Sequence, residues 1–264
     1  MTRAKKSLGQ NFLKSKRALF DMVRAGEVKS GDTVLEIGPG KGALTETLLS
    51  AGAQVIAVEK DATLVEFLHK KFAEEIKGGK LEIIEKDILK LKIENLKIKN
   101  NSYKIVANIP YYITGELIRF FLENERAPSS MTLLVQKEVA DRIMARDKKE
   151  SILSISVKIY GEPKYHGKIS ARYFSPAPKV DSAIISIKNI RTPFKNKKEQ
   201  GLFFKIVRAG FAHKRKVLVG NLSQLFPKEK IIKTFKKYDI NEKSRAENLN
   251  IKKWQCLADN LQST

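Results

Sequence analysis

The chain has 264 residues, of which 42% are hydrophobic, enough for one large domain with a small appendage. Its 51 Lys and Arg residues outnumber its 29 Asp and Glu residues, and the net charge of +22 indicates a polyanionic partner such as nucleic acid. A single cysteine cannot form an intramolecular disulfide, and three dispersed histidines do not suggest a metal cluster. No apolar run is long enough for a membrane helix, and the basic N-terminus lacks the apolar stretch of a secretory signal. We therefore expect a cytoplasmic protein without metal.

Short apolar runs that are typical of strands alternate with helical patterns over the first two-thirds of the chain. The expected strands lie at 33–37, 55–58, 81–85, 104–107 and 131–135. After the second of these, Asp61 can cap a helix whose apolar residues recur at helical spacing from Leu64 to Ile76. Repeated β-α-β units with short connections predict an α/β fold with a doubly wound, mostly parallel, Rossmann-like sheet.

Two later apolar runs, 152–160 and 183–188, lack a clear helix between them. We expect them to form an antiparallel pair at one edge of the sheet. The polar, basic segment 191–200 is predicted to be a linker, and beyond it the apolar residues recur at helical spacing. The expected organisation is a Rossmann-like domain over residues 1–190, with a basic N-terminal segment, and a small basic helical domain over residues 191–264.

A glycine-rich loop, Gly38-Pro39-Gly40-Lys41-Gly42-Ala43, follows the first expected strand. Glycines there let the backbone turn sharply and approach a ligand closely. Together with Glu59, which lies 21 residues after Gly38, the loop also satisfies the dinucleotide pattern G-x-G-x-x-G/A. A nicotinamide enzyme, or a tight turn without a ligand, is therefore an alternative on these residues alone.

Polar residues end the next three strands, and the carboxyl ends of parallel strands are where open α/β sheets bind ligands. Glu59 can accept both hydroxyl groups of an adenosine ribose. Asp87 can accept a hydrogen bond from an adenine amino group, although it can also cap a turn. Asn108 follows the fourth strand, where a dehydrogenase needs no Asn-Ile-Pro-Tyr sequence.

The segment Asn108-Ile109-Pro110-Tyr111-Tyr112 suits the methylation of an exocyclic amine. The adenine amino group is a poor nucleophile, because its lone pair is delocalised. The side chain of Asn108 and the carbonyl of Ile109, held extended before Pro110, can accept its two N–H groups and favour a pyramidal nitrogen. Tyr111 can stack on a base that has left its own stack, whereas we expect Tyr112 to be a core aromatic. The segment resembles the (D/N/S)-(I/L/P)-P-(Y/F) motif of nucleobase amino-methyltransferases.

Four further segments carry a wider resemblance. They are 8–13 (LGQNFL), 36–42 (EIGPGKG), 174–183 (FSPAPKVDSA) and 211–218 (FAHKRKVL). Over about residues 5 to 250 the chain resembles the small-subunit ribosomal RNA adenine N6,N6-dimethyltransferases. In that family the segment at 211–218 is the basic helix that opens the small domain.

The resemblance implies S-adenosylmethionine as cofactor and a role for each matching residue. Cofactor contacts would come from Asn11, Leu13, Gly38, Gly40, Glu59, Asp87 and Asn108. Catalytic positions would be Asn108, Ile109, Pro110, Tyr111 and Phe174, with Phe174 packing on the target base opposite Tyr111 unless it is only a buried strand-end aromatic. RNA phosphates would be bound by Lys5, Lys6, Lys14, Lys214, Arg215 and Lys216.

The implied reaction is dimethylation of N6 of two adjacent adenosines near the 3′ end of small-subunit rRNA, by a monomer that acts in small-subunit biogenesis. The sister family that methylates one adenine of large-subunit rRNA and confers macrolide resistance shares the cofactor and Asn-x-Pro-Tyr residues. Gly9 and the segment 175–178 (SPAP) look more like the small-subunit enzymes. Two positions depart mildly from the family. Residue 109 is Ile where Leu is commoner, and residues 213–216 are HKRK where the family has an Arg pair. A mainly non-catalytic ribosome-assembly or transcription factor on the same scaffold is the third alternative.

Overall fold

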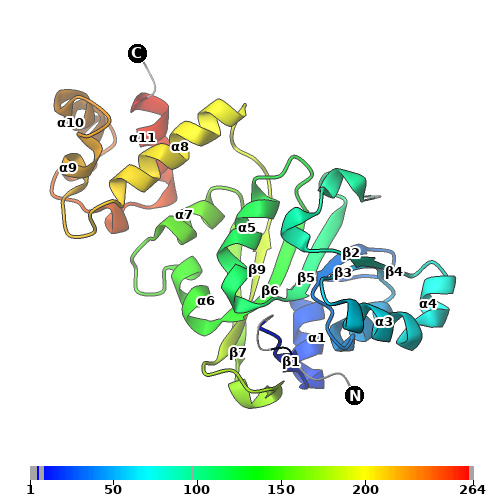
Figure 1. The fold of residues 1–264 in the computed structure, drawn as a ribbon. Helices are drawn as coiled ribbons and strands as arrows, with labels where there is room; N and C mark the ends of the chain where they lie inside the picture. The colour runs from blue at the N-terminus through cyan, green and yellow to red at the C-terminus, as the bar shows by residue number, and fades with distance from the viewer. Residues whose placement is uncertain (1–4, 6–8, 97, 262–264) are drawn as a thin grey trace. The chain divides into compact units, whose positions relative to one another are not determined.

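The computed structural model describes residue 5 and residues 9–96 and 98–261, and Figure 1 traces them along the chain. Contacts divide the chain into two compact units. The first contains Met1–Ala140 and Gly161–Arg191, and the second contains Asp141–Tyr160 and Thr192–Thr264. Within the described residues, no helix combines the length and the apolarity that a bilayer span requires.

The first unit is built on a seven-stranded sheet with the order β4-β3-β2-β5-β6-β9-β7. The strands are β2 (Thr33–Ile37), β3 (Gln54–Glu59), β4 (Leu81–Glu85), β5 (Tyr103–Asn108), β6 (Ser130–Gln136), β7 (Glu162–Ile169) and β9 (Ser182–Lys188). The first five run parallel, and β9 runs antiparallel to both of its neighbours. The α/β, Rossmann-like fold class predicted from the sequence is confirmed.

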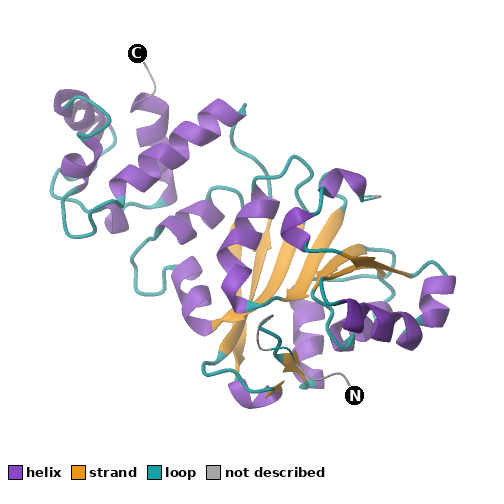
Figure 2. Cartoon of the chain, viewed as in Figure 1, coloured by secondary structure: helices purple, strands orange, loops and turns teal. Residues whose placement is uncertain are grey.

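Helices follow the strands and pack against the sheet, which forms the central layer of this unit in Figure 2. They are α1 (Lys16–Ala25), α2 (Ala43–Ser50), α3 (Ala62–Lys71), α4 (Ala73–Lys77), α5 (Thr114–Leu122) and α6 (Lys137–Met144). Asp61 caps α3 as predicted, because its carboxylate accepts a hydrogen bond from the backbone N–H of Thr63 at 3.1 Å. The middle strands are apolar almost throughout, as expected for parallel strands covered on both faces.

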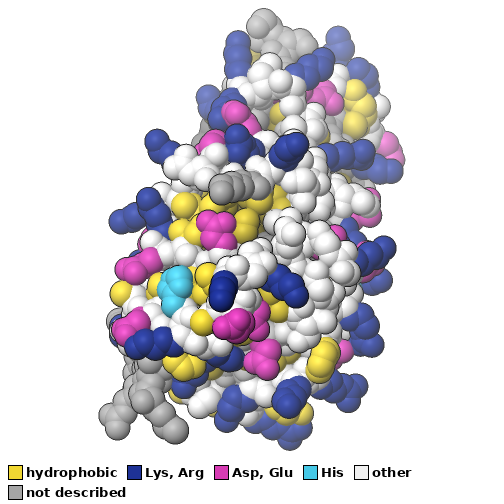
Figure 3. Space-filling view, turned by 90° about the vertical axis from the view of Figure 1, so that its right-hand side faces the viewer, with side chains coloured by type: hydrophobic (Ala, Val, Ile, Leu, Met, Phe, Trp, Pro, Cys, Tyr) yellow, Lys and Arg dark blue, Asp and Glu magenta, His cyan; other side chains and the backbone are white. Residues whose placement is uncertain are grey.

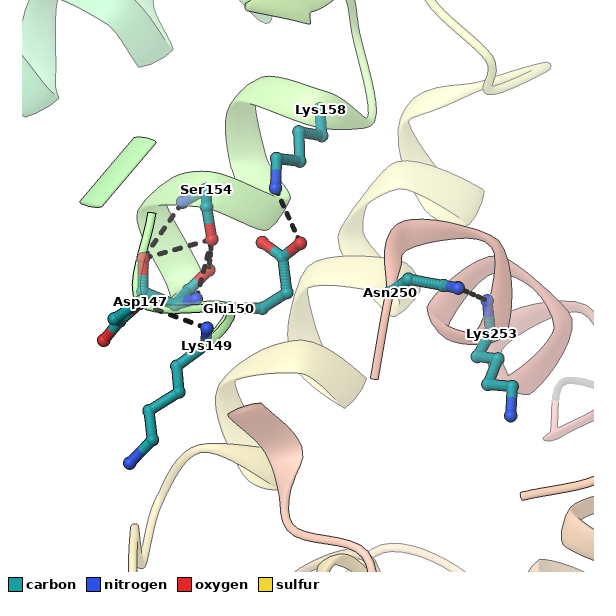
Figure 4. Close-up of polar contacts among 8 residues, drawn as sticks. Asp147, Lys149, Glu150, Ser154, Lys158, Asn250 and Lys253 are labelled. Atoms are coloured by element: carbon teal, nitrogen blue, oxygen red, sulfur yellow. Dashed lines mark hydrogen bonds and ion pairs between the residues drawn. The ribbon is translucent and has the colours of Figure 1, made fainter. Parts of the chain in front are cut away.

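The prediction that residues 152–160 form an edge strand is wrong, because this run contains helix α7 (Ile152–Lys158). Its N-terminus has a capping box, drawn in Figure 4: the Ser151 hydroxyl accepts from the Ser154 N–H at 3.1 Å, and the Ser154 hydroxyl accepts from the Ser151 N–H at 2.7 Å. The β-branched residues of the run favour a strand only weakly. The cap and the burial of Ile155 and Val157 in the second unit favour the helix.

The antiparallel neighbour of β9 on the outer edge of the sheet is β7, which was not predicted as a strand from the sequence. Pro163 and Gly167 interrupt its pattern, and both residues usually weaken strands. At a sheet edge they are tolerated, since Pro there needs no ladder partner on its outer side. Gly167 adopts a φ of 152° at an irregularity in the pairing between Tyr165 and Gly167.

The second unit is helical, as the pattern after residue 200 predicted. Besides α7, it contains α8 (Lys197–Gly210), α9 (Leu218–Leu222), α10 (Lys228–Lys237) and α11 (Ile251–Leu261). Trp254 is completely buried and stacks on Phe211 with ring centroids 5.6 Å apart. A Cβ at Gly210 would lie 2.4 Å from the Trp254 ring, so only glycine allows this approach.

The loop before α7 is joined to the C-terminal part of this unit by polar contacts. The backbone N–H of Glu150 donates to the carbonyl of Glu247 at 2.9 Å, and Lys149 pairs with the Glu247 carboxylate at 3.2 Å. Lys158 in turn donates to Glu150 at 2.6 Å, as Figure 4 shows. These contacts place residues 141–160 with the helical unit, although strands of the first unit lie on both sides of them in the sequence.

Candidate functional site

A cavity of about 840 Å³ lies at the carboxyl edge of the parallel strands of the first unit. It brings together most of the site residues that the sequence predicted in this unit. Those that line it are Asn11, Leu13, Lys14, Gly38, Gly40, Glu59, Asp87, Asn108, Ile109, Pro110 and Tyr111. Residues from four successive strand ends thus face one space, as the β-α-β pattern predicted.

The glycine loop between β2 and α2 is left-handed at three positions. Gly38, Gly40 and Gly42 have φ values of 66°, 60° and 75°. The Gly38 N–H donates to the carbonyl of Val58 at 2.9 Å, which joins the loop to the end of β3. A Cβ at Gly40 would lie 2.9 Å from the ring of Phe12, so the N-terminal segment can cover the loop only because that Cβ is missing.

We expect the substitutions Gly42→Ala and Gly38→Ala to differ in their effect on stability. At Gly42 the added methyl would lie 2.4 Å from Phe72 Cε2, whereas at Gly38 it meets nothing within 4 Å. Backbone strain acts at both positions, but overpacking acts only at Gly42. Gly42→Ala should therefore lower the free energy of unfolding by about 2–4 kcal/mol and Gly38→Ala by about 1 kcal/mol. Urea unfolding measures both, and equal losses would contradict the packing seen at Gly42.

Glu59 is a fixed hydrogen-bond acceptor at the end of β3. Its side chain is buried, and its carboxylate accepts from the backbone N–H groups of Gly40 at 3.2 Å, Lys60 at 2.8 Å and Asp61 at 3.0 Å. Burial raises the pKa of the Glu59 carboxyl, and the three N–H groups partly oppose that rise. The carboxylate lines the cavity and keeps acceptor capacity for a ligand hydroxyl group.

Glu36 at the end of β2 is a second buried acid on the cavity wall, which the sequence analysis noted only as part of a motif. Its side chain is 1% exposed and accepts a hydrogen bond from the Thr45 hydroxyl at 2.6 Å. Burial, and less strongly the nearby charge of Glu59, raises the pKa of Glu36 to about 8. A group with this pKa carries a proton at neutral pH when no ligand is bound.

Glu36→Gln is expected to flatten the pH dependence of stability. The Glu36 pKa rises from its ordinary value of 4.5 to about 8 on folding, so the folded chain binds this proton more tightly. Stability therefore falls as pH rises from about 4.5 through about 8. Glutamine does not titrate, and its amide oxygen can still accept from Thr45.

Urea unfolding at about pH 6 and about pH 9 measures the effect. From about pH 6 to about pH 9, the free energy of unfolding should fall by roughly 2–3 kcal/mol less in the variant than in the wild type. The difference between the pKa of Glu36 in the folded and unfolded chain sets this amount. Parallel stability profiles for the two proteins would show that Glu36 does not carry this proton.

Asp87, just after β4, both caps a turn and lines the cavity. Its carboxylate accepts from the backbone N–H of Leu89 at 3.1 Å and from the ammonium group of Lys60 at 2.8 Å. The hydrogen bond from Lys60 lowers the pKa of Asp87, so this group is ionised. The two roles that the sequence left open, turn cap and ligand acceptor, are compatible because each carboxylate oxygen can accept more than one hydrogen bond.

The N-terminal segment lies along the cavity. Its short strand β1 (Phe12–Leu13) pairs with β8 (Phe174–Ser175), and the carbonyl of Asn11 accepts from the Asn108 side-chain amide at 3.2 Å. Nearer the terminus, Asp61 binds the Lys5 ammonium at 2.6 Å.

The expected RNA-binding residues of this segment differ in their surroundings. Lys5 is engaged with Asp61, and Lys14 is exposed and lines the cavity. Lys6 lies outside the described residues. Whether the lysines bind phosphate stays a prediction.

Three aromatic residues have different surroundings from one another. Tyr111 is half-buried, lines the cavity and shares a 2.7 Å hydrogen bond with Ser182. Tyr112 also lines the cavity and is 65% exposed, so the prediction that it is a core aromatic is wrong. Phe174 is 2% exposed and packs in the core beside Leu13 rather than on the cavity wall, and its contact with a base stays a prediction.

The basic residues Lys214, Arg215 and Lys216 are exposed in the second unit. The expectation that they lie on a helix is wrong, because they occupy the turn between α8 and α9. Asn221 fixes this turn, since its side-chain amide donates to the carbonyls of Gly210 at 2.6 Å and His213 at 3.2 Å. Lys and Arg side chains are spread widely over the face drawn in Figure 3, in keeping with the net charge of +22.

The sequence model of a family described as ribosomal RNA adenine dimethylase matches residues 1–263. The chain belongs to this family. A curated relative from Dehalococcoides mccartyi, named ribosomal RNA small subunit methyltransferase A, is 41% identical over 258 residues, which cover 97% of this chain and 87% of the relative. Membership confirms the family predicted from the motifs and the enzyme class, an rRNA adenine dimethyltransferase, and it removes the nicotinamide alternative.

Solved structures of similar proteins have the same fold as this dimethylase. A dimethyladenosine transferase from Plasmodium falciparum is 26% identical with a TM-score of 0.77, covering 93% of this chain and 95% of that one. The 23S rRNA methyltransferase ErmE is 23% identical and has a TM-score of 0.78, and the match covers 96% of this chain and 100% of the ErmE chain. The fold alone therefore does not separate enzymes that act on different ribosomal RNAs.

The cavity wall combines apolar, basic and acidic side chains with an amide and aromatic rings. Among the described residues, no group of three or more His, Cys, Asp or Glu side chains is placed to hold a metal ion. Hydrogen-bond acceptors of this dimethylase include Glu59, Asp87 and Asn108, and Tyr111 supplies a ring. Such a set can bind a nucleoside and hold an amino group.

Proposed function

We propose that this dimethylase transfers methyl groups from S-adenosylmethionine to N6 of two adjacent adenosines near the 3′ end of small-subunit rRNA. The observation that carries the proposal is the position of Asn108 and Tyr111 on the wall of the same cavity as Glu59 and Asp87. The name of the Dehalococcoides mccartyi relative, whose length this chain largely covers, supports the small subunit as the target.

The cavity residues fit S-adenosylmethionine. A ribose needs an acceptor for two hydroxyl groups, and Glu59 presents a carboxylate fixed by three backbone N–H groups. An adenine amino group needs an acceptor, and Asp87 lies beyond the end of the neighbouring strand. We propose that Gly38 and Gly40 allow the methionine part to approach the backbone, and that Asn11 and Leu13 cover the cofactor from the N-terminal side.

When bound, the cofactor supplies an activated methyl group. The residues of the chain then have to hold the target amine and exclude water. In our proposal, the Asn108 side-chain oxygen and the Ile109 carbonyl accept the two N–H groups of adenine N6, and Pro110 keeps the Ile109 backbone extended. Tyr111 stacks on the flipped base, and such a contact contributes roughly 1–3 kcal/mol, comparable with the cost of extruding the base. The proton is released to solvent after transfer.

We propose that the expected domain of residues 1–190, apart from residues 141–160 that pack with the helical unit, acts as the methyltransferase domain, and that residues 191–264 act as an RNA-binding domain of a cytoplasmic monomer. The charge supports the second role, since residues 191–264 carry 18 basic and 6 acidic side chains. Lys5, Lys6 and Lys14 would add phosphate contacts beside the cavity. Lys5 would have to exchange its contact with Asp61 for a phosphate.

Replacing Lys214, Arg215 and Lys216 together by alanine should weaken rRNA binding and its salt dependence. Log affinity falls with log salt concentration, and each phosphate contact contributes about 0.7–0.9 to the steepness of that fall. The slope of the triple variant should therefore be less negative by about 2–3. Filter binding of small-subunit rRNA at several salt concentrations measures it. A variant that removes the same charge from the exposed residues Lys77, Lys80 and Lys99 is the control. An unchanged slope in the first variant would remove the basic turn from the RNA-binding surface.

The proposed function is tested by methyl transfer to small ribosomal subunits purified from a strain that lacks the modification. Labelled S-adenosylmethionine supplies the methyl group, large subunits run in parallel, and mass spectrometry locates the product. We expect two adjacent dimethyladenosines in the small subunit. Label only in the large subunit would indicate the macrolide-resistance activity, and no label with tight RNA binding would indicate a non-catalytic assembly factor.

A further inference from the structure

Ser182 is a buried polar residue that touches the expected base-stacking ring. It begins β9, is completely buried, and has its hydroxyl oxygen 2.7 Å from the hydroxyl oxygen of Tyr111. The two residues are 71 positions apart in the sequence. Ser182 lies within the segment 174–183, and no sequence pattern predicts a role for it.

The backbone at Ser182 is held firmly from several sides. In the sheet, Ser182 is in register with Gln136 on β6 and with Ile169 on β7. The preceding residue, Asp181, accepts from the Ala171 N–H at 3.0 Å through its carboxylate and from the Lys137 N–H at 2.9 Å through its carbonyl. The Ser182 hydroxyl is therefore attached to a rigid corner of the first unit.

Tyr111 is held at its backbone end as well. It begins a 3₁₀ turn directly after Pro110, and its carbonyl accepts from the Thr114 hydroxyl at 3.0 Å. A tyrosine held only at the backbone can still swing its ring about the side-chain bonds. The hydrogen bond to Ser182 fixes the far end, so the long axis of the ring, from Cβ to the hydroxyl oxygen, is held beside the cavity at both ends of the side chain.

We propose that Ser182 is a positioning residue, which acts through the hydroxyl of Tyr111 to hold that ring at the position on the cavity wall that receives the target base. This inference rests on the proposed function for the identity of the base. Stacking on a ring that is already held in position gives the largest binding free energy, because the side chain loses no further conformational freedom when the base binds. Phenylalanine would offer the same aromatic face, so the hydroxyl of Tyr111 is needed for its bond to Ser182 and not for stacking.

Ser186 provides a matched comparison on the same strand. It is also completely buried, and its hydroxyl lies 2.8 Å from a ring nitrogen of His166, with no contact to the cavity. Ser186→Ala therefore removes a similar buried hydroxyl–ring hydrogen bond from β9 without touching Tyr111. If Ser182 served only the stability of the strand, the two alanine variants would behave alike.

The test compares methyl-transfer kinetics of Ser182→Ala, Ser182→Thr, Tyr111→Phe, the double variant Ser182→Ala/Tyr111→Phe, and Ser186→Ala. Ser182→Ala and Tyr111→Phe should each lower kcat/KM for rRNA by about five- to tenfold, the range of one neutral hydrogen bond, with KM for S-adenosylmethionine unchanged. The double variant should lose no more than either single variant, because both changes remove the same bond. Ser182→Thr, which keeps the hydroxyl, should recover most of the activity, and Ser186→Ala should match the wild type.

Additive losses in the double variant, or equal losses in Ser182→Ala and Ser186→Ala, would overturn the proposal. A readout that needs no substrate is the averaging of Tyr111 between its χ1 rotamers, followed by NMR side-chain couplings in protein with labelled tyrosine. The averaging should increase in Ser182→Ala and not in Ser186→Ala, and equal averaging in wild type and Ser182→Ala would also overturn the proposal. If the wild type transfers no methyl group to any RNA, the proposed function fails, while the ring measurement still decides whether Ser182 fixes Tyr111.

Discussion

Asn108→Ala is expected to lower the rate of methyl transfer by on the order of 10²–10³, the range seen when one preorganised polar group that contacts the reacting centre is removed. Asn108 is the last residue of β5, and it lines the cavity. Its Nδ2 donates to the Asn11 carbonyl at 3.2 Å, which fixes the orientation of the amide and leaves Oδ1 as the acceptor for the target amine. Alanine removes that acceptor and also releases one contact with the N-terminal segment.

The loss should appear mainly in the transfer step. The change removes one neutral hydrogen bond to the N-terminal segment and the expected neutral contact of Asn108 with the cofactor, so affinity for S-adenosylhomocysteine should fall by about tenfold, far less than the transfer rate. Single-turnover methyl transfer to small subunits, beside calorimetric titration of the cofactor product, separates the two effects. Gln136→Ala is a matched control, because this amide ends the neighbouring strand β6 and does not line the cavity. Transfer by Asn108→Ala at a tenth of the wild-type rate or more would remove Asn108 from the reacting centre.

The sequence predicted the cavity well because parallel strands bring their carboxyl ends to one sheet edge. Glu59, Asp87 and Asn108 are separated by 28 and 21 residues, yet each ends or follows a strand of the same sheet. The repeated β-α-β pattern was enough to place them together. Positions that depend only on this topology can therefore be predicted from the sequence.

Contacts between side chains distant in sequence were not predictable in the same way. The bond between Tyr111 and Ser182 depends on the antiparallel insertion of β9 beside β6, and the pair of Lys5 with Asp61 depends on the path of the N-terminal segment. Neither geometry leaves a periodic signal in the sequence. The exposure of Tyr112 was missed for a related reason, since aromatic residues favour the core on average and only the local turn decides otherwise.

The errors of secondary structure have local physical causes. Residues 152–160 contain three Ile, one Val and one Tyr, which favour strands, but a capping box and burial in the helical unit favour the helix. Strand β7 contains Pro163 and Gly167, two residue types that are rare inside strands, so its sequence does not predict a strand. An edge strand tolerates both. In each case the tertiary surroundings overrode a weak local preference.

Glu59→Ala is expected to weaken binding of S-adenosylhomocysteine by on the order of 10². Two hydrogen bonds from ribose hydroxyls to a carboxylate would be lost, and bonds to a charged group contribute about 1.5–3 kcal/mol each, partly offset by relief of the buried charge. The change also leaves the backbone N–H groups of Gly40, Lys60 and Asp61 without their acceptor. The glycine loop and the start of α3 should therefore loosen, and the free energy of unfolding should fall as well.

Glu85→Ala is the matched control for this loss. Glu85 ends β4 and is the register partner of Glu59 on the neighbouring strand, but it is exposed and does not line the cavity. Glu59→Gln separates charge from geometry, since its amide oxygen can still accept backbone N–H groups, and it should lie between wild type and alanine in affinity. Calorimetric titration with S-adenosylhomocysteine measures all three variants. Equal affinity in Glu59→Ala and Glu85→Ala would mean that the ribose is held elsewhere, because a bound nucleoside cannot lose its only buried carboxylate acceptor on β3 without a loss of binding free energy.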